Sequence, residues 1–173
     1  AEFLKQKYNL MHLSTGDIFR YNIKNDTELG QLAKQYMDKG DLVPDAVTIK
    51  MLEDIVNKNL NSAGFLFDGF PRTLAQAVEL DDFLENKNWN IAATIALEAN
   101  DEILINRILE RGKTSGRTDD QDEEKIRHRY QEYNEKTAPL IEYYKKQNKF
   151  YPVNGIGSIA EITERLSKVI DNL

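Results

Sequence analysis

The sequence predicts an α/β fold with a doubly wound parallel sheet. Short apolar segments, interpreted as buried strands, alternate along the chain with longer segments in which apolar residues recur at helical spacing. The segment Ile91–Leu97 is apolar at nearly every position, which is typical of a strand covered on both faces. The apolar segment Gly64–Phe67 leads directly into Asp68, and ligands of such sheets bind at the carboxyl ends of the strands.

The first half of the chain supplies two of the predicted strands. Phe3, Leu4 and Tyr8 recur at helical spacing, which predicts a helix at the beginning. No capping residue precedes Ala1, so we expect this helix to belong to a longer chain. Strands are predicted at 10–13 and 64–67. One helix is predicted to begin at Ser14 or Thr15, and a second helix is predicted at 29–37, with Gly40 ending it. Two more helices are predicted to begin at Pro44–Asp45 and at Thr73.

The next part of the chain contains one polar interruption. Asn100 is predicted to cap a helix that follows the apolar segment Ile91–Leu97. The polar segment 112–122 then interrupts the apolar periodicity, which predicts that this helix ends there. A long helix follows, and Asp119 and Asp120 are its candidate capping residues.

The last quarter returns to the regular alternation. The segment 137–139 predicts a break and a new helix, because its Pro is tolerated in a first turn but not in a helix interior. A last strand is predicted at 150–153. Ser158 and Glu161 form a capping box, which predicts a C-terminal helix.

Composition narrows the class of protein. A length of 173 residues fits one domain with small inserts, and a net charge of −6 argues against a nucleic-acid-binding protein. No apolar run approaches the ~20 residues that span a membrane, and no signal peptide is visible. The chain has no cysteine, which excludes disulfides and thiolate zinc sites and is compatible with a cytoplasmic location.

Arginines are concentrated around the polar segment. Arg107 and Arg111 lie four residues apart on one predicted helix, where like charges repel by roughly 0.2–0.5 kcal/mol. An anion bound between them would turn the repulsion into an attractive clamp, whereas a solvated surface would simply tolerate it. Arg117 and Arg129 follow. Arg127 is expected on a different side of its helix from Arg129, so we interpret it as solvated or salt-bridged.

Several other polar residues admit a purely structural interpretation. Thr73 and Gln76 match a capping box, in which Gln76 would reach back to the backbone. Asp68 is either a capping carboxylate or a magnesium ligand acting through coordinated water. His12 and His128 have no cysteine or second histidine at metal-ligand spacing, and we interpret both as packing or surface residues.

Three motifs together carry a family resemblance. They are Ser14-Thr15-Gly16-Asp17, Asp68-Gly69-Phe70-Pro71-Arg72-Thr73 and Gly116-Arg117-Thr118-Asp119-Asp120. With these motifs in this order, the chain resembles the short-lid adenylate kinases from Ala1 to Leu173. The resemblance implies a P-loop kinase fold with a helical AMP-binding insert at 14–43 and a short lid at 111–121. It also implies a cytoplasmic monomer without zinc that interconverts MgATP plus AMP and two ADP.

One part of the family pattern does not occur in these residues. The opening strand and the glycine-rich phosphate loop ending in Gly-Lys-Gly-Thr are missing from the sequence. In the family that strand lies in the middle of the sheet, between the strands predicted here at 64–67 and 91–97. We therefore expect a gap in the sheet. We also expect these 173 residues alone to fold poorly and to be inactive, because nothing cradles the β- and γ-phosphates.

The resemblance also implies residue roles. Catalytic roles fall on Asp68, Arg72, Arg111, Arg117 and Arg129. AMP is expected to contact Thr15, Arg20, Asp41, Leu42, Val43, Gly69, Phe70, Pro71, Arg72, Gln76, Arg117 and Arg129. ATP is expected to contact Arg107, Arg111 and Gly157. Mg²⁺ is expected to bind Asp68 through water. Asp119 and Asp120 are expected to hold the lid in its closed position. The Phe70–Pro71 peptide is expected to be cis.

Two alternatives to an AMP kinase remain open at this point. A pyrimidine nucleoside monophosphate kinase would share the motifs, but Thr15, Thr73 and Gln76 favour AMP as the acceptor. A non-catalytic nucleotide-binding remnant would lack phosphate-loop chemistry. Asp17 could likewise be only a first-turn partner of its helix dipole.

Overall fold

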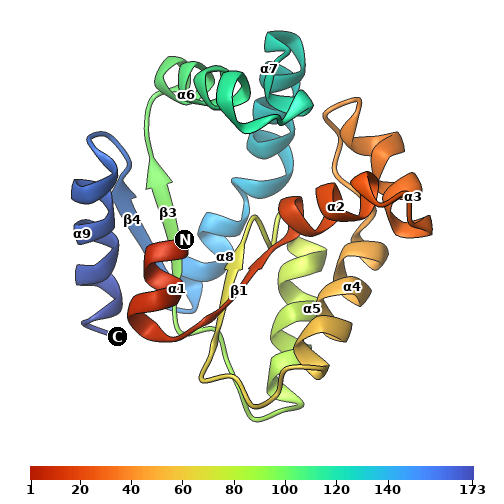
Figure 1. Cartoon of the computed structure of the whole chain (residues 1–173). Coiled ribbons are helices and arrows are strands. Elements are labelled where there is room, and N and C mark those ends of the chain that lie inside the picture. The colour runs from red at the N-terminus through yellow and green to blue at the C-terminus, as the bar shows by residue number, and fades with distance from the viewer.

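The computed structural model describes residues 1–117 and 119–173 (Figure 1). Thr118, which belongs to the third sequence motif, lies outside the described residues. The elements follow in the order α1 (Glu2–Tyr8), β1 (Met11–Ser14), α2 (Thr15–Lys24), α3 (Glu28–Met37), α4 (Asp45–Asn57), β2 (Phe65–Asp68), α5 (Leu74–Glu85), β3 (Thr94–Glu98), α6 (Asp101–Ser115), η1 (Thr118–Asp120), α7 (Glu123–Glu132), η2 (Tyr133–Thr137), α8 (Leu140–Lys146), β4 (Phe150–Asn154) and α9 (Ile159–Ile170).

The strands pair in parallel, as predicted, but they form two separate two-stranded sheets. In one sheet β1 pairs with β2, and Met11 lies opposite Phe65. In the other, β3 pairs with β4, and Thr94 lies opposite Phe150. Among the described residues, no ladder of hydrogen bonds joins β2 to β3. The predicted gap between these two strands is therefore confirmed.

Strand β3 is shorter and more exposed than the sequence predicted. It begins at Thr94 rather than Ile91, because its pairing starts only where β4 starts, at Phe150. The prediction that both of its faces are covered is wrong, and Leu97 is 49% exposed. Among the described residues β3 pairs only with β4, so no strand covers its other edge.

Helix α6 is longer than predicted. It continues through Gly112 to Ser115 and ends at Gly116, whose φ of 67° is left-handed. Gly112 is favoured here because a Cβ atom at that position would lie 2.4 Å from the carbonyl oxygen of Asp120. The polar segment therefore packs against the end of α6 and does not terminate the helix at Gly112.

The cap of α7 also differs from the prediction. Its capping residue is Asp122, whose side chain accepts hydrogen bonds from the backbone N–H groups of Glu124 and Lys125. Asp119 and Asp120 do not cap the helix, because their carboxylates bind arginine side chains. The other predicted caps are confirmed at Ser14, Thr73, Asn100 and Ser158, and the Phe70–Pro71 peptide is cis as predicted.

The main hydrophobic core joins the first sheet to residues 14–43, which contain α2 and α3 and are called the helical insert below. Leu13 of β1, Phe19 of α2 and Val43 after α3 are all buried in one cluster with Leu52 of α4 and Leu80 of α5. A second cluster lies under α8 and contains Ala77, Leu140 and Tyr144. Because α2 and the chain after α3 share the core of β1, the insert has a fixed base. None of the helices in the described part of the chain is both long enough and apolar enough to cross a membrane.

Helices α2 and α3 approach each other closely at Gly30. A Cβ atom there would lie 2.2 Å from the carbonyl oxygen of Asn22 and 2.6 Å from the backbone nitrogen of Ile23. These neighbours are backbone atoms of the other helix, so they cannot move aside as a flexible side chain could. Gly30 is therefore required for packing, although glycine in a helix interior normally costs about 1 kcal/mol relative to alanine.

We expect Gly30→Ala to lower the free energy of unfolding by about 2–3 kcal/mol, because the added methyl group forces α2 and α3 apart. Urea denaturation provides the measurement. Gln31→Ala at the neighbouring exposed position is the control and should change stability by less than about 0.5 kcal/mol. Helix propensity alone would make the Gly30→Ala variant more stable than the wild type. Such an increase in stability would contradict this packing.

Candidate active site

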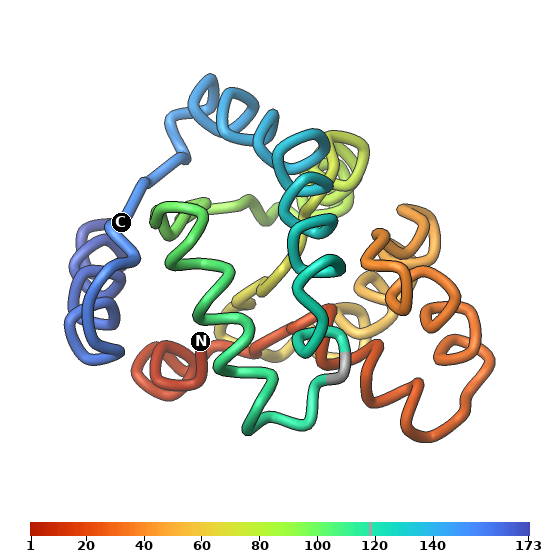
Figure 2. Tube along the Cα trace, turned by 90° about the horizontal axis from the view of Figure 1, so that it is seen from above, coloured from red at the N-terminus to blue at the C-terminus, as the bar shows by residue number. Residues whose placement is uncertain are grey.

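A pocket lies between the helical insert and the chain around α7. Its walls come from α2, the loop between α3 and α4, the turn between β2 and α5, and the segment from η1 to α7. Figure 2 shows the insert and the segment around α7 converging in this region of the molecule. The lining residues are Thr15, Gly16, Phe19, Arg20, Met37, Gly40, Asp41, Leu42, Val43, Thr48, Gly69, Arg72, Gln76, Asp119, Arg129 and Glu132.

Three arginines from different elements meet in this pocket. Arg20 comes from α2, Arg72 from the turn before α5, and Arg129 from α7. Desolvation, followed by the nearby positive charge of Arg129, lowers the pKa of the Arg72 guanidinium. Nε of Arg72 donates to the carbonyl oxygen of Gly69 at 2.8 Å, which fixes the direction of the side chain. Such a concentration of guanidinium groups favours an anion, phosphate above all.

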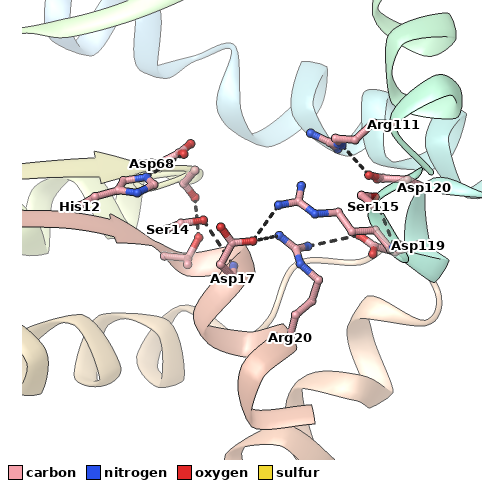
Figure 3. A network of polar contacts seen from close by, with 12 residues as sticks. His12, Ser14, Asp17, Arg20, Asp68, Arg111, Ser115, Asp119 and Asp120 are labelled. Atoms are coloured by element: carbon pink, nitrogen blue, oxygen red, sulfur yellow. Dashed lines mark hydrogen bonds and ion pairs between the residues drawn. The ribbon is translucent and has the colours of Figure 1, made fainter. Parts of the chain in front are cut away.

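Carboxylates link Arg20 and Arg129, together with Arg117, into one network (Figure 3). Oδ1 of Asp17 accepts hydrogen bonds from Arg20 and from Arg117, each at 2.7 Å. Nη1 of Arg20 lies 3.5 Å from Oδ2 of Asp119. Nη1 of Arg129 donates to the same Asp119 oxygen at 3.2 Å. The insert is therefore connected to η1 and α7 by alternating positive and negative side chains.

The network ends on a buried carboxylate. Asp120 is fully buried and accepts hydrogen bonds from Nη1 of Arg129 at 2.9 Å and Nε of Arg111 at 2.6 Å. Burial alone would raise the pKa of Asp120, but the contacts with Arg111 and Arg129 outweigh it and lower the pKa. In Asp17, the contacts with Arg20 and Arg117 likewise outweigh desolvation and lower the pKa of the carboxyl group.

The two histidines also contact carboxylates, which the sequence did not indicate. Nε2 of His12 lies 3.0 Å from Oδ2 of Asp68, across the paired strands β1 and β2. Figure 3 shows this pair at the end of the strands, facing the arginine network. Nε2 of His128 lies 2.8 Å from Oδ1 of Asp41. Among the described residues, no group of three or more His, Cys, Asp or Glu side chains could by itself hold a metal ion.

Comparison with known proteins identifies the family. The adenylate kinase family model matches residues 1–149 of this chain. The adenylate kinase of Flavobacterium psychrophilum is 76% identical over 173 residues, which cover all of this chain and 91% of that protein. The adenylate kinases of Flavobacterium johnsoniae and Bacteroides fragilis are 72% and 42% identical over the same lengths. This chain belongs to the adenylate kinase family.

In this adenylate kinase, the pocket gathers most of the residues that the sequence analysis placed against AMP. Phe70, Pro71 and Arg117 are not among the residues that line it. Gln76 is buried, and both ends of its amide are held. Its Oε1 accepts from the backbone N–H of Arg72, and its Nε2 donates to Oδ1 of Asp45, both at 2.7 Å. Gln76 therefore reaches back to the backbone, as the capping box predicts. Its partner is the N–H of Arg72, one residue before the cap Thr73.

The residues expected to contact ATP are not among those that line this pocket. Nη1 of Arg107 donates to the carbonyl oxygen of Gly155, and Nη2 lies 3.4 Å from that of Gly157. Arg111 instead points to Asp120. Although they share a helix face, the two arginines therefore contact different partners and do not converge on one point. Arg127 pairs with Glu123 and Glu102, which agrees with its interpretation as a salt-bridged surface residue.

Sequence reasoning missed several residues of the pocket. Gly16 and Phe19 are neighbours of the first motif, and Asp119 belongs to the third, so motif proximity could have identified them. Met37 and Glu132 carry no such signal, because their place in the pocket depends on how α3 and α7 pack. Gly40 and Thr48 complete the missed residues.

Acid should lower the stability of the folded protein through Asp17 and Asp120. Asp17 and Asp120 have lower pKa values in the folded protein than their ordinary values, so their ionised forms stabilise the fold above about pH 4. That contribution is lost as the pH falls through the lower folded pKa values. We expect the free energy of unfolding, measured with urea from pH 7 to pH 3, to decrease below about pH 4.

The variant Asp120→Asn should be less stable by about 2–3 kcal/mol at pH 7 and should lose less stability on acidification. This figure is below that for a fully enclosed pair because Arg111 is 44% exposed. Asp54→Asn, at an exposed position of α4, is the control and should keep the wild-type pH profile. A wild-type acid response in Asp120→Asn would contradict the assignment.

Proposed function

We propose that this adenylate kinase transfers a phosphoryl group from ATP to AMP, forming two ADP, and that the pocket beside α7 binds AMP. The observation that carries the proposal is the convergence of Arg20, Arg72 and Arg129 in one pocket with the buried amide of Gln76. Three guanidinium groups suit a phosphate, and the second N–H and second oxygen lone pair of the Gln76 amide, beyond its bonds to Asp45 and Arg72, suit the edge of a base. In this reading Leu42, Val43 and Phe19 provide apolar contact area.

The carboxylates of the network have a role in this proposal. Phosphoryl transfer depends on positioning and on neutralising charge, since the protein contributes little covalent chemistry. Asp17 and Asp119 hold Arg20, Arg117 and Arg129 at defined positions before a nucleotide binds. A phosphate group can then replace a carboxylate as the partner of the same guanidinium groups. Arg117 and Arg129 would neutralise the phosphoryl group during transfer.

Asp68 is the proposed magnesium residue. It stands at the end of β2, is half-exposed, and accepts a hydrogen bond from His12. Mg²⁺ usually keeps several waters and binds through one or two carboxylates together with substrate phosphates, so a single exposed carboxylate fits it. When bound with ATP, the ion supplies charge neutralisation on the phosphates. Asp68 would hold it through coordinated water.

ATP is proposed to lie against Arg107, Arg111 and Gly157. Arg107 joins α6 to the loop after β4, so it holds the two segments that would border the nucleotide. We propose residues 111–121 as a short lid and residues 14–43 as the AMP-binding insert. Closure of the lid would exclude water, which otherwise competes with AMP as the acceptor.

The other properties of the proposal follow from the family resemblance and from composition. We propose a cytoplasmic monomer that acts on ATP, AMP and ADP without zinc. A net charge of −6 supports the absence of a nucleic-acid partner. Because the relatives at 72–76% identity are named adenylate kinases, neither a pyrimidine nucleoside monophosphate kinase nor a non-catalytic remnant is favoured.

The AMP site is tested by removing its arginines. We expect Arg72→Ala and Arg20→Ala each to weaken AMP binding by about 10- to 100-fold, because each removes a charge-assisted contact worth roughly 1.5–3 kcal/mol. ATP binding should change much less. Isothermal titration with each nucleotide separately is the measurement, and Arg127→Ala is the matched control. Equal losses for both nucleotides would place these arginines in a different site.

We further propose that a polypeptide of these 173 residues alone does not catalyse the transfer. The sequence contains no glycine-rich loop ending in Gly-Lys-Gly-Thr, and a phosphate loop supplies the N–H groups and the lysine that hold the β- and γ-phosphates. A coupled assay for ADP should show activity only when the same residues are preceded by the strand and phosphate loop of an adenylate kinase. Transfer by the 173-residue polypeptide, with its mass verified, would refute this proposal.

A further inference from the structure

A hydrogen bond joins two segments that are 87 residues apart in the sequence. Nε2 of His128 lies 2.8 Å from Oδ1 of Asp41. A carboxylate oxygen accepts hydrogen bonds, so Nε2 of the imidazole is the donor. His128 belongs to α7, and Asp41 belongs to the loop between α3 and α4. The contact therefore ties the helical insert to the helix that also carries Arg129.

The backbone of the loop packs against α7 at the same place. A Cβ atom at Gly40 would lie 3.2 Å from Cδ2 of His128, 3.2 Å from the carbonyl oxygen of Lys125 and 3.3 Å from Cγ of Arg129. Gly40 also has a φ of 84°, in the left-handed region that favours glycine. The loop is thus held against α7 by a close backbone approach and by one side-chain hydrogen bond.

The neighbours of this contact line the pocket. Leu42 and Val43 follow Asp41 in the loop, and Arg129 follows His128 in α7. The position of the loop relative to α7 therefore sets the distance between two walls of the pocket. The side chains of His128 and Asp41 are 41% and 39% exposed. Water therefore competes for their hydrogen bond, which is of moderate strength.

We propose that His128 is a positioning residue for AMP: its hydrogen bond to Asp41 holds residues 40–43 against α7 and so keeps the pocket at the width that AMP requires. The proposal rests on the proposed function, in which this pocket binds AMP. His128 acts through Asp41 and does not itself line the pocket. Lys136 also lies near enough to Asp41 for their charges to interact, and it is paired with Glu132.

The geometric part of the proposal can be tested without any nucleotide. The chain has no cysteine, so Gln35→Cys on α3 and Glu124→Cys on α7 would provide two unique, exposed sites for spin labels. We expect His128→Ala to broaden the measured distance distribution and shift it to longer distances. His128→Gln, which can place a donor near the position of Nε2, should restore the wild-type distribution. An unchanged distribution in His128→Ala would overturn the proposal.

The functional part is tested by nucleotide affinity. We expect His128→Ala to weaken AMP binding by about three- to fivefold, the range for a half-exposed hydrogen-bonded pair, and to leave ATP binding unchanged. His128→Gln should recover most of the loss, and His128→Ala should have no further effect in an Asp41→Ala background. Gln131→Ala, an exposed position of α7 that bonds to Glu135, is the matched control and should keep wild-type affinity.

These outcomes separate the two proposals. If the wild-type protein binds no AMP, the proposed function of the pocket fails, while the spin-label distances still decide whether His128 holds the loop. If His128→Ala alters the distances but leaves AMP affinity unchanged, His128 is structural only and the positioning role is refuted. Equal weakening of AMP and ATP binding would also refute it, because Leu42, Val43 and Arg129 beside the contact line the pocket proposed for AMP.

Discussion

The arrangement of the candidate active site depends on one buried carboxylate. Asp120 has no exposed surface, and two arginines from different helices donate hydrogen bonds to it. An ionised carboxylate cannot remain buried without such partners, so Arg111 and Arg129 cannot both turn away while the fold is intact. The ends of α6 and α7 are therefore fixed relative to each other by a charge requirement. In the proposed function, catalysis by arginines would need this kind of preorganisation, because reorienting charged groups during the reaction is costly.

Close packing around Asp120 transmits that constraint to the rest of the pocket. Gly112 allows the backbone of Asp120 to approach α6, and the side chain of Gln121 donates to the carbonyl oxygen of Gly112 at 3.1 Å. This fixes the neighbouring Asp119, whose carboxylate contacts both Arg129 and the Arg20 side chain of α2. The insert and the region around α7 are thus connected through a short segment whose own position is set by α6.

The sequence predicted the local features of this protein better than its long-range contacts. Helix caps such as Asn100 and Ser158 were predictable because the capping group and its N–H partners lie within three residues of each other. The length of β3 was not predictable, because it is set by a partner strand more than fifty residues away. In the site, Arg20, Arg72 and Arg129 were singled out from the sequence and line one pocket, and their roles stay predictions. The partner of His128 was not, because no local pattern relates it to Asp41.

The carboxylates of the site fall into two groups that differ in exposure, and the difference has a functional consequence. Asp120 is fully buried, so solvent reaches its bonds to Arg111 and Arg129 only from the arginine side, and these bonds are the more persistent ones. The side chain of Asp17 is 54% exposed, so its bonds to Arg20 and Arg117 are weak and readily exchanged. A site rich in arginine must balance its positive charge in order to fold, yet must release some of that balance to bind phosphate. In the proposed function, burial of Asp120 meets the first requirement and exposure of Asp17 meets the second, since the phosphate of AMP would carry more charge than the carboxylate that it displaces.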